Sequence, residues 1–268
     1  MEEKTAALVD EHNRMLSGAY DAPAVDLKKV LPVLHTFRDR FASAIADTAG
    51  IINGAAAAGK EVLIEGAQGA LLDVDFGTYP FVTSSNTTIG GVSTGLGLSL
   101  RKVDRIIGII KAYTTRVGNG PFPTELTDAT GDSLRDAGHE YGATTGRPRR
   151  CGWFDSVVAR YSMLINDVDT LALTKLDVLD RLAEIKICTG YRVNGELVEN
   201  WTDACAFWED AEPVYETLPG WRQPLSRARS LTDLPVAART YIDRLQELTG
   251  VGFSIISVGP KRSETIVL

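Results

Sequence analysis

Short apolar, β-branched runs that end in polar turns recur between helical stretches, and this alternation constrains the fold more than any other feature. The runs Leu171–Leu173 and Phe253–Val258 are typical of buried strands because they are too short for helices and are followed by polar turns. Residues 185–191 and 265–268 are further candidate strands. Glu61–Gly66 has the pattern of a buried strand that leads into a functional turn.

The stretches between these candidate strands carry helical signals. Apolar residues recur at three- and four-residue steps within the first sixty residues, where Pro32 marks either a first turn or a kink. Pro235 opens another helical stretch, and Gly250 closes it. Strands that alternate with helices predict an α/β fold with a largely parallel central sheet and helices around it. We expect residues 1–268 to form one domain.

The composition excludes several classes of protein. With 28 basic and 35 acidic residues the net charge is −7, which argues against a general nucleic-acid or anionic-membrane surface. No apolar run approaches the roughly 18 residues that a transmembrane helix requires, and the charged N-terminus is unlike a secretory signal. The 3 cysteines and 3 histidines are scattered, which predicts neither a disulfide framework nor a zinc site and favours the reducing cytoplasm.

The tetrapeptide Thr174–Asp177 follows a candidate strand and carries the sharpest chemical signal. The carboxylate of Asp177 can accept hydrogen bonds from both N1–H and the 2-amino group of guanine, which adenine does not offer. The stem of Lys175 can lie over the base while its ammonium stays solvated. The alternative is a surface ion pair. The tetrapeptide lies at a strand end, where open α/β sheets bind ligands, and this position supports guanine recognition.

A second strand end supports a nucleotide site. The turn Ser257–Val258–Gly259 follows an apolar run and offers backbone groups to a base edge, although a plain tight turn is the alternative.

Residues 142–150 read GATTGRPRR and place three arginines beside glycines and hydroxyls. Guanidinium groups bind carboxylates and phosphates bidentately, so this loop is suited to a small dianionic substrate. A solvated basic loop is the alternative.

Two further segments are candidates for ligand contact. Gln68, in the sequence EGAQG, has an amide that can stabilise a developing oxyanion, unless it is a structural residue of a tight turn. Residues 77–98 contain no charge and are rich in glycine, serine and threonine, which is typical of a surface loop or of a ligand-lining segment.

Taken in order, these segments resemble the adenylosuccinate synthetase family over nearly the whole chain. The resemblance rests on the motifs EGAQG, DVDFGTYPFVTSSNTT, KAYTTRVGNGPFPTEL, GATTGRPRR, TKLDVLD, PVYETLPGW and SVGP. It implies a synthetase fold related to the P-loop NTPases. It also implies a GTP- and Mg²⁺-dependent ligase that joins IMP and L-aspartate into adenylosuccinate in AMP biosynthesis, acting as a cytoplasmic homodimer.

The resemblance also implies roles for individual residues. Gln68 matches the glutamine that stabilises the oxyanion at the 6-position of IMP, and the other positions that match IMP contacts are Thr83, Val117 and Arg147. The positions that match the aspartate-binding loop are Gly142, Ala143, Thr144, Thr145 and Arg147. The positions that match GTP contacts are Arg149, Lys175, Leu176, Asp177, Ser257, Val258 and Gly259. Pro148 departs from the pattern, because the family usually has a basic residue there.

The glycine-rich loop with which the family binds the GTP phosphates has no counterpart in this sequence. We therefore expect an N-terminally truncated chain that is inactive by itself, with the metal ligands in the segment that precedes it. A non-catalytic nucleotide-binding remnant or a scaffold that pairs with a full-length subunit is the alternative. A generic guanine-nucleotide hydrolase is a further alternative, but it too requires a phosphate loop.

Overall fold

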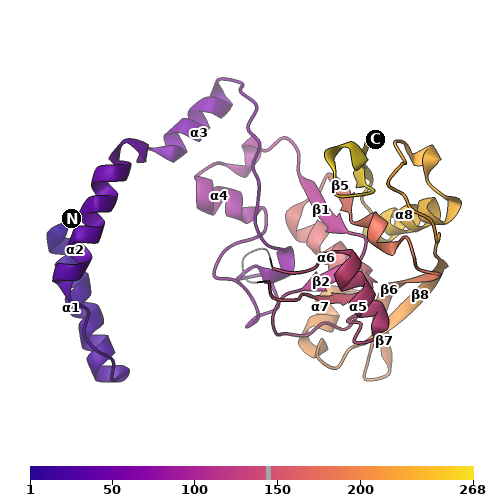
Figure 1. The fold of residues 1–268 in the computed structure, drawn as a ribbon, viewed down its shortest axis with the longest axis horizontal. Helices are drawn as coiled ribbons and strands as arrows, with labels where there is room; N and C mark the ends of the chain where they lie inside the picture. The colour runs from indigo at the N-terminus through magenta and orange to yellow at the C-terminus, as the bar shows by residue number, and fades with distance from the viewer. Residues whose placement is uncertain (143–145) are drawn as a thin grey trace. The chain divides into compact units, whose positions relative to one another are not determined.

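The computed structural model describes residues 1–142 and 146–268, which divide into two compact units, Met1–Lys60 and Glu61–Leu268 (Figure 1). None of the helices in these residues is long and apolar enough to cross a membrane. The expectation of one domain over residues 1–268 stays a prediction.

The first unit consists of the helices α1 (Glu2–Ala19), α2 (Leu27–Phe41) and α3 (Thr48–Ala57), as the helical periodicity predicts. Asp26 caps α2, where its side chain accepts a hydrogen bond from the backbone N–H of Lys28. Pro32 lies inside α2, beyond the first turn.

The second unit contains the central sheet, whose strand order among the described residues is β1-β5-β9-β10. The strands β1 (Ile107–Lys111), β5 (Thr170–Thr174) and β9 (Phe253–Ser257) run parallel, and β10 (Thr265–Val267) is antiparallel to β9. The predicted strands at 171–173, 253–258 and 265–268 are therefore confirmed. Their shared parallel direction brings the carboxyl ends of β1, β5 and β9 to one edge of the sheet.

The predicted strand at 185–191 is also present, but it lies in a different sheet. There β6 (Glu184–Val193) pairs with β4 (Phe154–Asp155), β7 (Glu196–Val198) and β8 (Glu212–Pro219). A further antiparallel pair joins β2 (Thr114–Arg116) to β3 (Arg150–Gly152).

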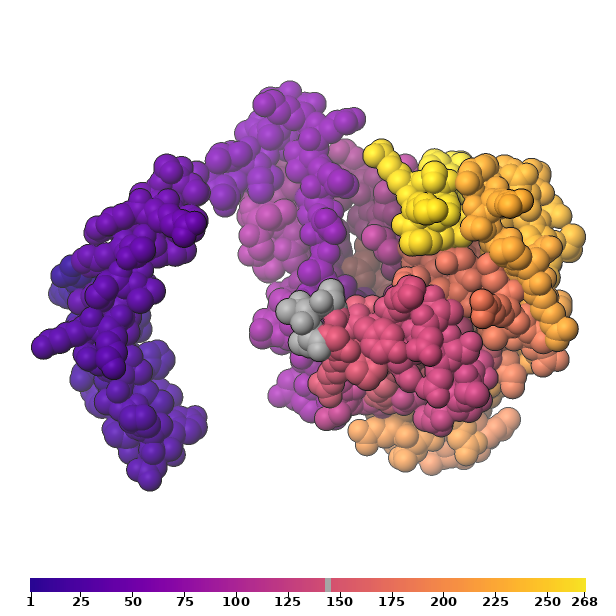
Figure 2. Space-filling model, viewed as in Figure 1, coloured from indigo at the N-terminus to yellow at the C-terminus, as the bar shows by residue number. Residues whose placement is uncertain are grey.

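Helices cover these sheets. The helix α8 (Val236–Thr249) starts after Pro235 and ends at Gly250, whose φ of 73° lies in the left-handed region that glycine adopts without strain. Its buried face, which includes Tyr241, belongs to the same hydrophobic core as β5 and β9. In Figure 2 the yellow C-terminal surface lies against the orange surface that includes α8. The remaining helices are α4 (Gly90–Leu96), α5 (Ala129–Ala137), α6 (Ser156–Asn166) and α7 (Trp201–Ala204).

The prediction of a strand at Glu61–Gly66 is wrong. The segment forms no strand, and Leu63 is 94% exposed. A strand needs a neighbouring strand to satisfy its backbone N–H and C=O groups, and none lies beside this segment within the described part of the chain.

One buried carboxylate closes the loop of residues 69–88, which includes the first half of the glycine- and threonine-rich residues 77–98. Asp73 is fully buried and accepts hydrogen bonds from the backbone N–H groups of Asp75 and Phe76 on one oxygen. Its other oxygen accepts from the backbone N–H groups of Thr87 and Thr88, at 2.7 and 3.1 Å. The loop is thereby closed on itself, and its last residues continue into α4.

These bonds also set the charge of Asp73. Burial by itself raises the pKa of the Asp73 carboxyl, but the four backbone N–H donors outweigh it and hold the pKa below its ordinary value of 3.8.

We predict that Leu173→Ala lowers the free energy of unfolding by about 2–5 kcal/mol, because Leu173 is fully buried in the central strand β5. The matched control is Leu164→Ala, since Leu164 is 78% exposed and should change stability by less than about 0.5 kcal/mol. Urea denaturation of both variants measures the difference. Equal losses in the two would contradict the placement of β5 in the core.

We predict that Asp73→Asn costs about 1–3 kcal/mol at neutral pH, because the new amide group faces backbone N–H donors that lose their acceptor. A carboxyl whose folded pKa is depressed contributes stability above its unfolded pKa and loses it as pH falls through the folded pKa. The difference in unfolding free energy between wild type and variant should therefore shrink as pH falls below 3.8. A pH-independent difference would count against an ionised Asp73; Asp243→Asn, at an exposed position of α8, serves as the control.

Candidate functional site

The two turns predicted to read guanine lie at the same edge of the central sheet. The 3₁₀ turn Leu176–Leu179 follows β5, and Ser257 is the last residue of the neighbouring parallel strand β9. This turn contacts β9, and the hydroxyl of Ser257 donates to the carbonyl of Gly259 at 2.8 Å. The structure thus brings together residues that are about eighty positions apart in the sequence, as the pairing of parallel strands requires.

Within the first turn, Lys175 and Asp177 are held differently. Lys175 has a φ of 63°, and its Nζ donates to the carbonyl oxygen of Gly138 at 2.5 Å. Asp177 is half-buried, and burial raises the pKa of its carboxyl while the neighbouring Lys175 opposes that effect. Leu176, between them, is fully buried and anchors the turn in the core.

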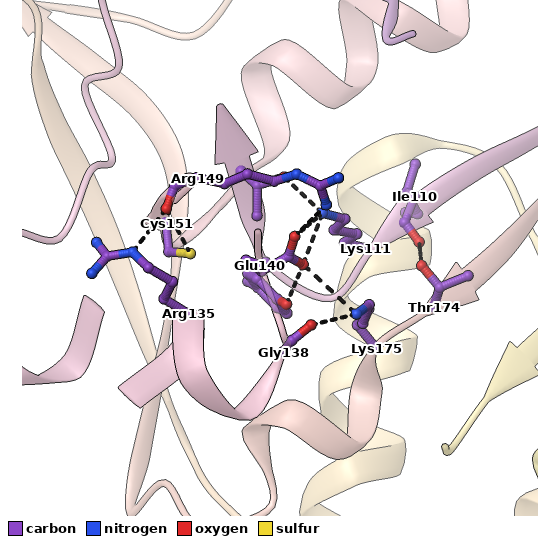
Figure 3. Close-up of polar contacts among 11 residues, drawn as sticks. Ile110, Lys111, Arg135, Gly138, Glu140, Arg149, Cys151, Thr174 and Lys175 are labelled. Carbon is purple, nitrogen blue, oxygen red and sulfur yellow. Dashed lines mark hydrogen bonds and ion pairs between the residues drawn. The ribbon is translucent and has the colours of Figure 1, made fainter. Parts of the chain in front are cut away.

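A buried carboxylate lies beside this turn and was not identified from the sequence (Figure 3). Glu140 is fully buried, and its oxygens accept hydrogen bonds from Lys111 Nζ at 2.8 and 2.9 Å. It also accepts from Tyr113 Oη at 2.6 Å and from Arg149 Nη1 at 2.7 Å. The Nζ of Lys175 is 3.9 Å from Oε1 of the same carboxylate. We refer to Lys111, Tyr113, Glu140, Arg149 and Lys175 as the Glu140 cluster.

The electrostatics of the cluster favour an ionised glutamate. Burial alone raises the pKa of Glu140, but the hydrogen bonds from Lys111, Tyr113 and Arg149 outweigh burial and hold the pKa below its ordinary value. Removing a carboxylate from water without such donors would cost several kcal/mol, on the order expected for an unpaired buried ion.

The same glutamate closes the neck of the arginine loop. The backbone N–H of Arg149 donates to the carbonyl oxygen of Glu140 at 2.9 Å, and the next residues inward form an antiparallel bridge between Tyr141 and Pro148. Further in, the N–H of Gly142 donates to the carbonyl oxygen of Arg147 at 2.8 Å. The predicted aspartate-binding residues Ala143, Thr144 and Thr145 lie outside the described residues.

The third arginine of the loop has a structural partner. Arg150 pairs with Glu125 through two hydrogen bonds and donates to the carbonyl oxygen of Gly120 at 2.7 Å. It also donates to the carbonyl oxygen of Gly118, which ties the predicted nucleotide-side segment Val117–Gly118 to the base of the loop. Arg150 therefore serves the fold of this region.

The remaining predicted site residues lie in the segment that follows residue 66. Gln68 is exposed and has a left-handed φ of 62°, and Thr83 is half-buried, with its backbone N–H donating to the carbonyl oxygen of Leu72 at 2.8 Å. Within the described residues, the hydrogen bonds of the Glu140 cluster include neither of them.

The donor set also bears on metal binding. Residues 1–142 and 146–268 contain no group of three or more His, Cys, Asp or Glu side chains that could hold a metal ion. They thus offer no such cluster to the magnesium ion that the sequence resemblance implies.

The signals for the Glu140 cluster were weak in the sequence. Glu140 is a lone acidic residue two positions before the loop that carries the arginines, and Lys111 and Tyr113 belong to the motif KAYTTRVG. No local pattern links positions 111 and 140, because their contact depends on how β1 and the loop neck fold together.

Comparisons with known proteins identify the family of the chain. The chain is 53% identical over 258 residues to the adenylosuccinate synthetase of Pelobacter propionicus, covering 96% of this chain and 60% of that protein. It is 47% identical over 266 residues to that of Caldanaerobacter subterraneus, covering 99% of this chain and 62% of that protein. This chain thus spans less than two thirds of the length of these curated relatives. It likewise covers 63% of the Plasmodium falciparum protein described next.

The fold is similar to that of fully ligated adenylosuccinate synthetase from Plasmodium falciparum, with a TM-score of 0.92 and 40% identity over 100% of this chain. This match confirms the α/β fold with a largely parallel central sheet that the alternation of strands and helices predicts. The model of the adenylosuccinate synthetase family matches residues 1–266. Since that match covers almost the entire chain, this chain belongs to the adenylosuccinate synthetase family.

Proposed function

We propose that this chain forms the guanine-nucleotide-binding and aspartate-binding part of an enzyme that ligates IMP and L-aspartate with GTP, as a step of AMP biosynthesis. The observation that carries the proposal is the convergence of three segments at one sheet edge. The turn with Lys175 and Asp177, the turn Ser257–Gly259 and the neck of the arginine loop meet there through β5, β9 and Glu140.

Guanine selectivity in this proposal comes from Asp177. Its half-buried carboxylate can accept from N1–H and the 2-amino group of guanine, while adenine would place an acceptor against it. Because Lys175 Nζ is tied to Gly138, the aliphatic stem of that side chain is the part left to pack on the base. The turn Ser257–Gly259 supplies backbone groups to the edge of the same base.

Aspartate binding in this proposal comes from the arginine loop. Arg147 binds a carboxylate of aspartate, together with Gly142 and with Ala143, Thr144 and Thr145, which lie outside the described residues. Arg149, proposed to contact GTP, is held at the loop neck by its hydrogen bond to Glu140. The proposed contacts to IMP rest on the family motifs that the residues match. These residues are Gln68, Thr83, Val117 and, in addition to its contact with aspartate, Arg147.

In the reaction of the whole protein, the γ-phosphoryl group of GTP passes to the 6-oxygen of IMP. The amino group of aspartate then forms the new C6–N bond, and the C6–O bond breaks as phosphate leaves. The products are adenylosuccinate, GDP and phosphate. Gln68 would stabilise the negative charge on the 6-oxygen.

The cellular setting is also part of the proposal. We infer a homodimer in the cytoplasm, as the family resemblance implies. The scattered cysteines, of which Cys151 and Cys188 are buried and Cys205 is exposed, are compatible with a reducing compartment.

Isothermal titration of the protein with GDP, ADP, IMP and L-aspartate tests the proposal. We expect binding of GDP, IMP and aspartate, with GDP preferred over ADP. A remnant that only binds nucleotides would bind GDP without aspartate. Equal affinity for GDP and ADP would contradict guanine recognition.

We predict that Asp177→Asn weakens GDP binding about tenfold to a hundredfold, because the variant loses a charged acceptor of two hydrogen bonds. The affinity for ADP should change little, so selectivity falls. The control is Asp180→Asn, since Asp180 lies in the same region but its carboxylate accepts from Trp221 and from the backbone of Leu225. An unchanged ratio of GDP to ADP affinity in Asp177→Asn would refute the assignment.

A further inference from the structure

Glu140 connects segments that carry different parts of the proposed site. Its donors come from the end of β1 (Lys111), from the residue before β2 (Tyr113) and from the residue before β3 (Arg149). Its side chain has no exposed surface, so it cannot itself touch a substrate. Any effect that it has on ligand binding must pass through the residues that it holds.

The link to the arginine loop is double. Glu140 accepts from the guanidinium of Arg149 through its carboxylate and from the backbone N–H of Arg149 through its carbonyl oxygen. The carbonyl oxygen of Arg149 in turn accepts from Arg135 Nε at 2.9 Å (Figure 3). The position of Arg149 at the loop neck is therefore fixed on both its main chain and its side chain.

The link to the guanine turn runs through Lys175. Its Nζ lies between the carbonyl oxygen of Gly138, at 2.5 Å, and Oε1 of Glu140, at 3.9 Å. The φ of Lys175, 63°, is one that residues other than glycine rarely adopt, so this anchor also holds the backbone of the turn.

The balance of charge makes the carboxylate necessary for this arrangement. The cluster contains the cations Lys111, Arg149 and Lys175 around one carboxylate. At such short range and with partial burial, the three cations repel one another. The attraction of each cation to the carboxylate between them offsets that repulsion. A neutral amide of the same shape would remove that attraction and would turn an N–H₂ group toward cationic donors.

We propose that Glu140 is a positioning residue that couples the guanine-reading turn to the arginine loop, so that guanine-nucleotide affinity and aspartate affinity both depend on its carboxylate. This inference rests on the proposed function, and it adds a residue and a coupling that the family motifs used above do not include.

The main test is Glu140→Gln in the full chain, with GDP and aspartate affinities measured by isothermal titration. We expect both affinities to fall about tenfold or more, which is the effect of losing roughly one charged hydrogen bond for each ligand. The control is Glu216→Gln, which breaks the ion pair of Glu216 with Arg244 outside the cluster. A loss of affinity for only one of GDP and aspartate, or for neither, overturns the coupling.

A double-mutant cycle separates positioning from general damage. If Glu140 acts on GDP through Lys175, the loss in Glu140→Gln combined with Lys175→Met is smaller than the product of the two single losses. A merely structural role would leave the two losses multiplicative, and that result overturns the proposal.

A milder variant keeps the test decisive if Glu140→Gln fails to fold. Tyr113→Phe removes one donor to Glu140 and keeps the carboxylate, and Tyr191→Phe is its matched control. Both tyrosines are almost completely buried and donate to a carboxylate, but Tyr191 donates to Asp155 in the other sheet. We expect Tyr113→Phe alone to weaken GDP and aspartate binding together, about twofold to fivefold. Equal effects of the two substitutions overturn the proposal.

The unmodified protein distinguishes failure of the inference from failure of the proposed function. If the wild-type chain binds GDP and aspartate and Glu140→Gln does so equally well, the proposed function stands and the positioning role of Glu140 is wrong. If the wild-type chain binds neither ligand, both are wrong.

Discussion

The ionised carboxylate of Glu140, buried among cations, is the interaction on which the arrangement of this site depends. A buried carboxylate is tolerated only where donors replace the water that it has lost, and here Lys111, Tyr113 and Arg149 do so. Since these donors come from separate segments, each of their backbones is constrained by the same group. The position of the loop neck relative to the strand ends is therefore fixed by this one carboxylate.

The parallel sheet provides the frame for that interaction. Hydrogen bonding in register aligns β1 with β5 and β5 with β9, and the polar residues that follow each strand emerge at one edge. Lys111 ends β1, Lys175 follows β5, and the turn at Ser257 ends β9. Asp73 does similar work in the loop of residues 69–88, where backbone N–H groups converge on one buried carboxylate. In both places a buried carboxylate holds loop segments together through several hydrogen bonds.

Some of this was accessible from the sequence, and some was not. The helix that Pro235 and Gly250 delimit and the strand that contains Leu173 follow from local periodicity and turn chemistry, and both are present. The pattern of Glu61–Gly66 is equally strand-like, yet the segment forms no strand, because a strand exists only with a partner for its backbone. Likewise, small hydroxyl residues predict a loop over 77–98 but not the helix α4 within it.

By itself the sequence pointed to the residues proposed to carry the chemistry, since the side chains of Asp177, Arg147 and Arg149 have donors and acceptors that suit guanine and anionic ligands wherever they lie. It also determined the family, because long ordered motifs do not depend on coordinates. Only the tertiary structure decided that Glu140 lies among Lys111, Arg149 and Lys175. It also decided that Arg150 pairs with Glu125. The physical reason is that burial and charge pairing arise between residues distant in sequence, and no local pattern records which of them meet.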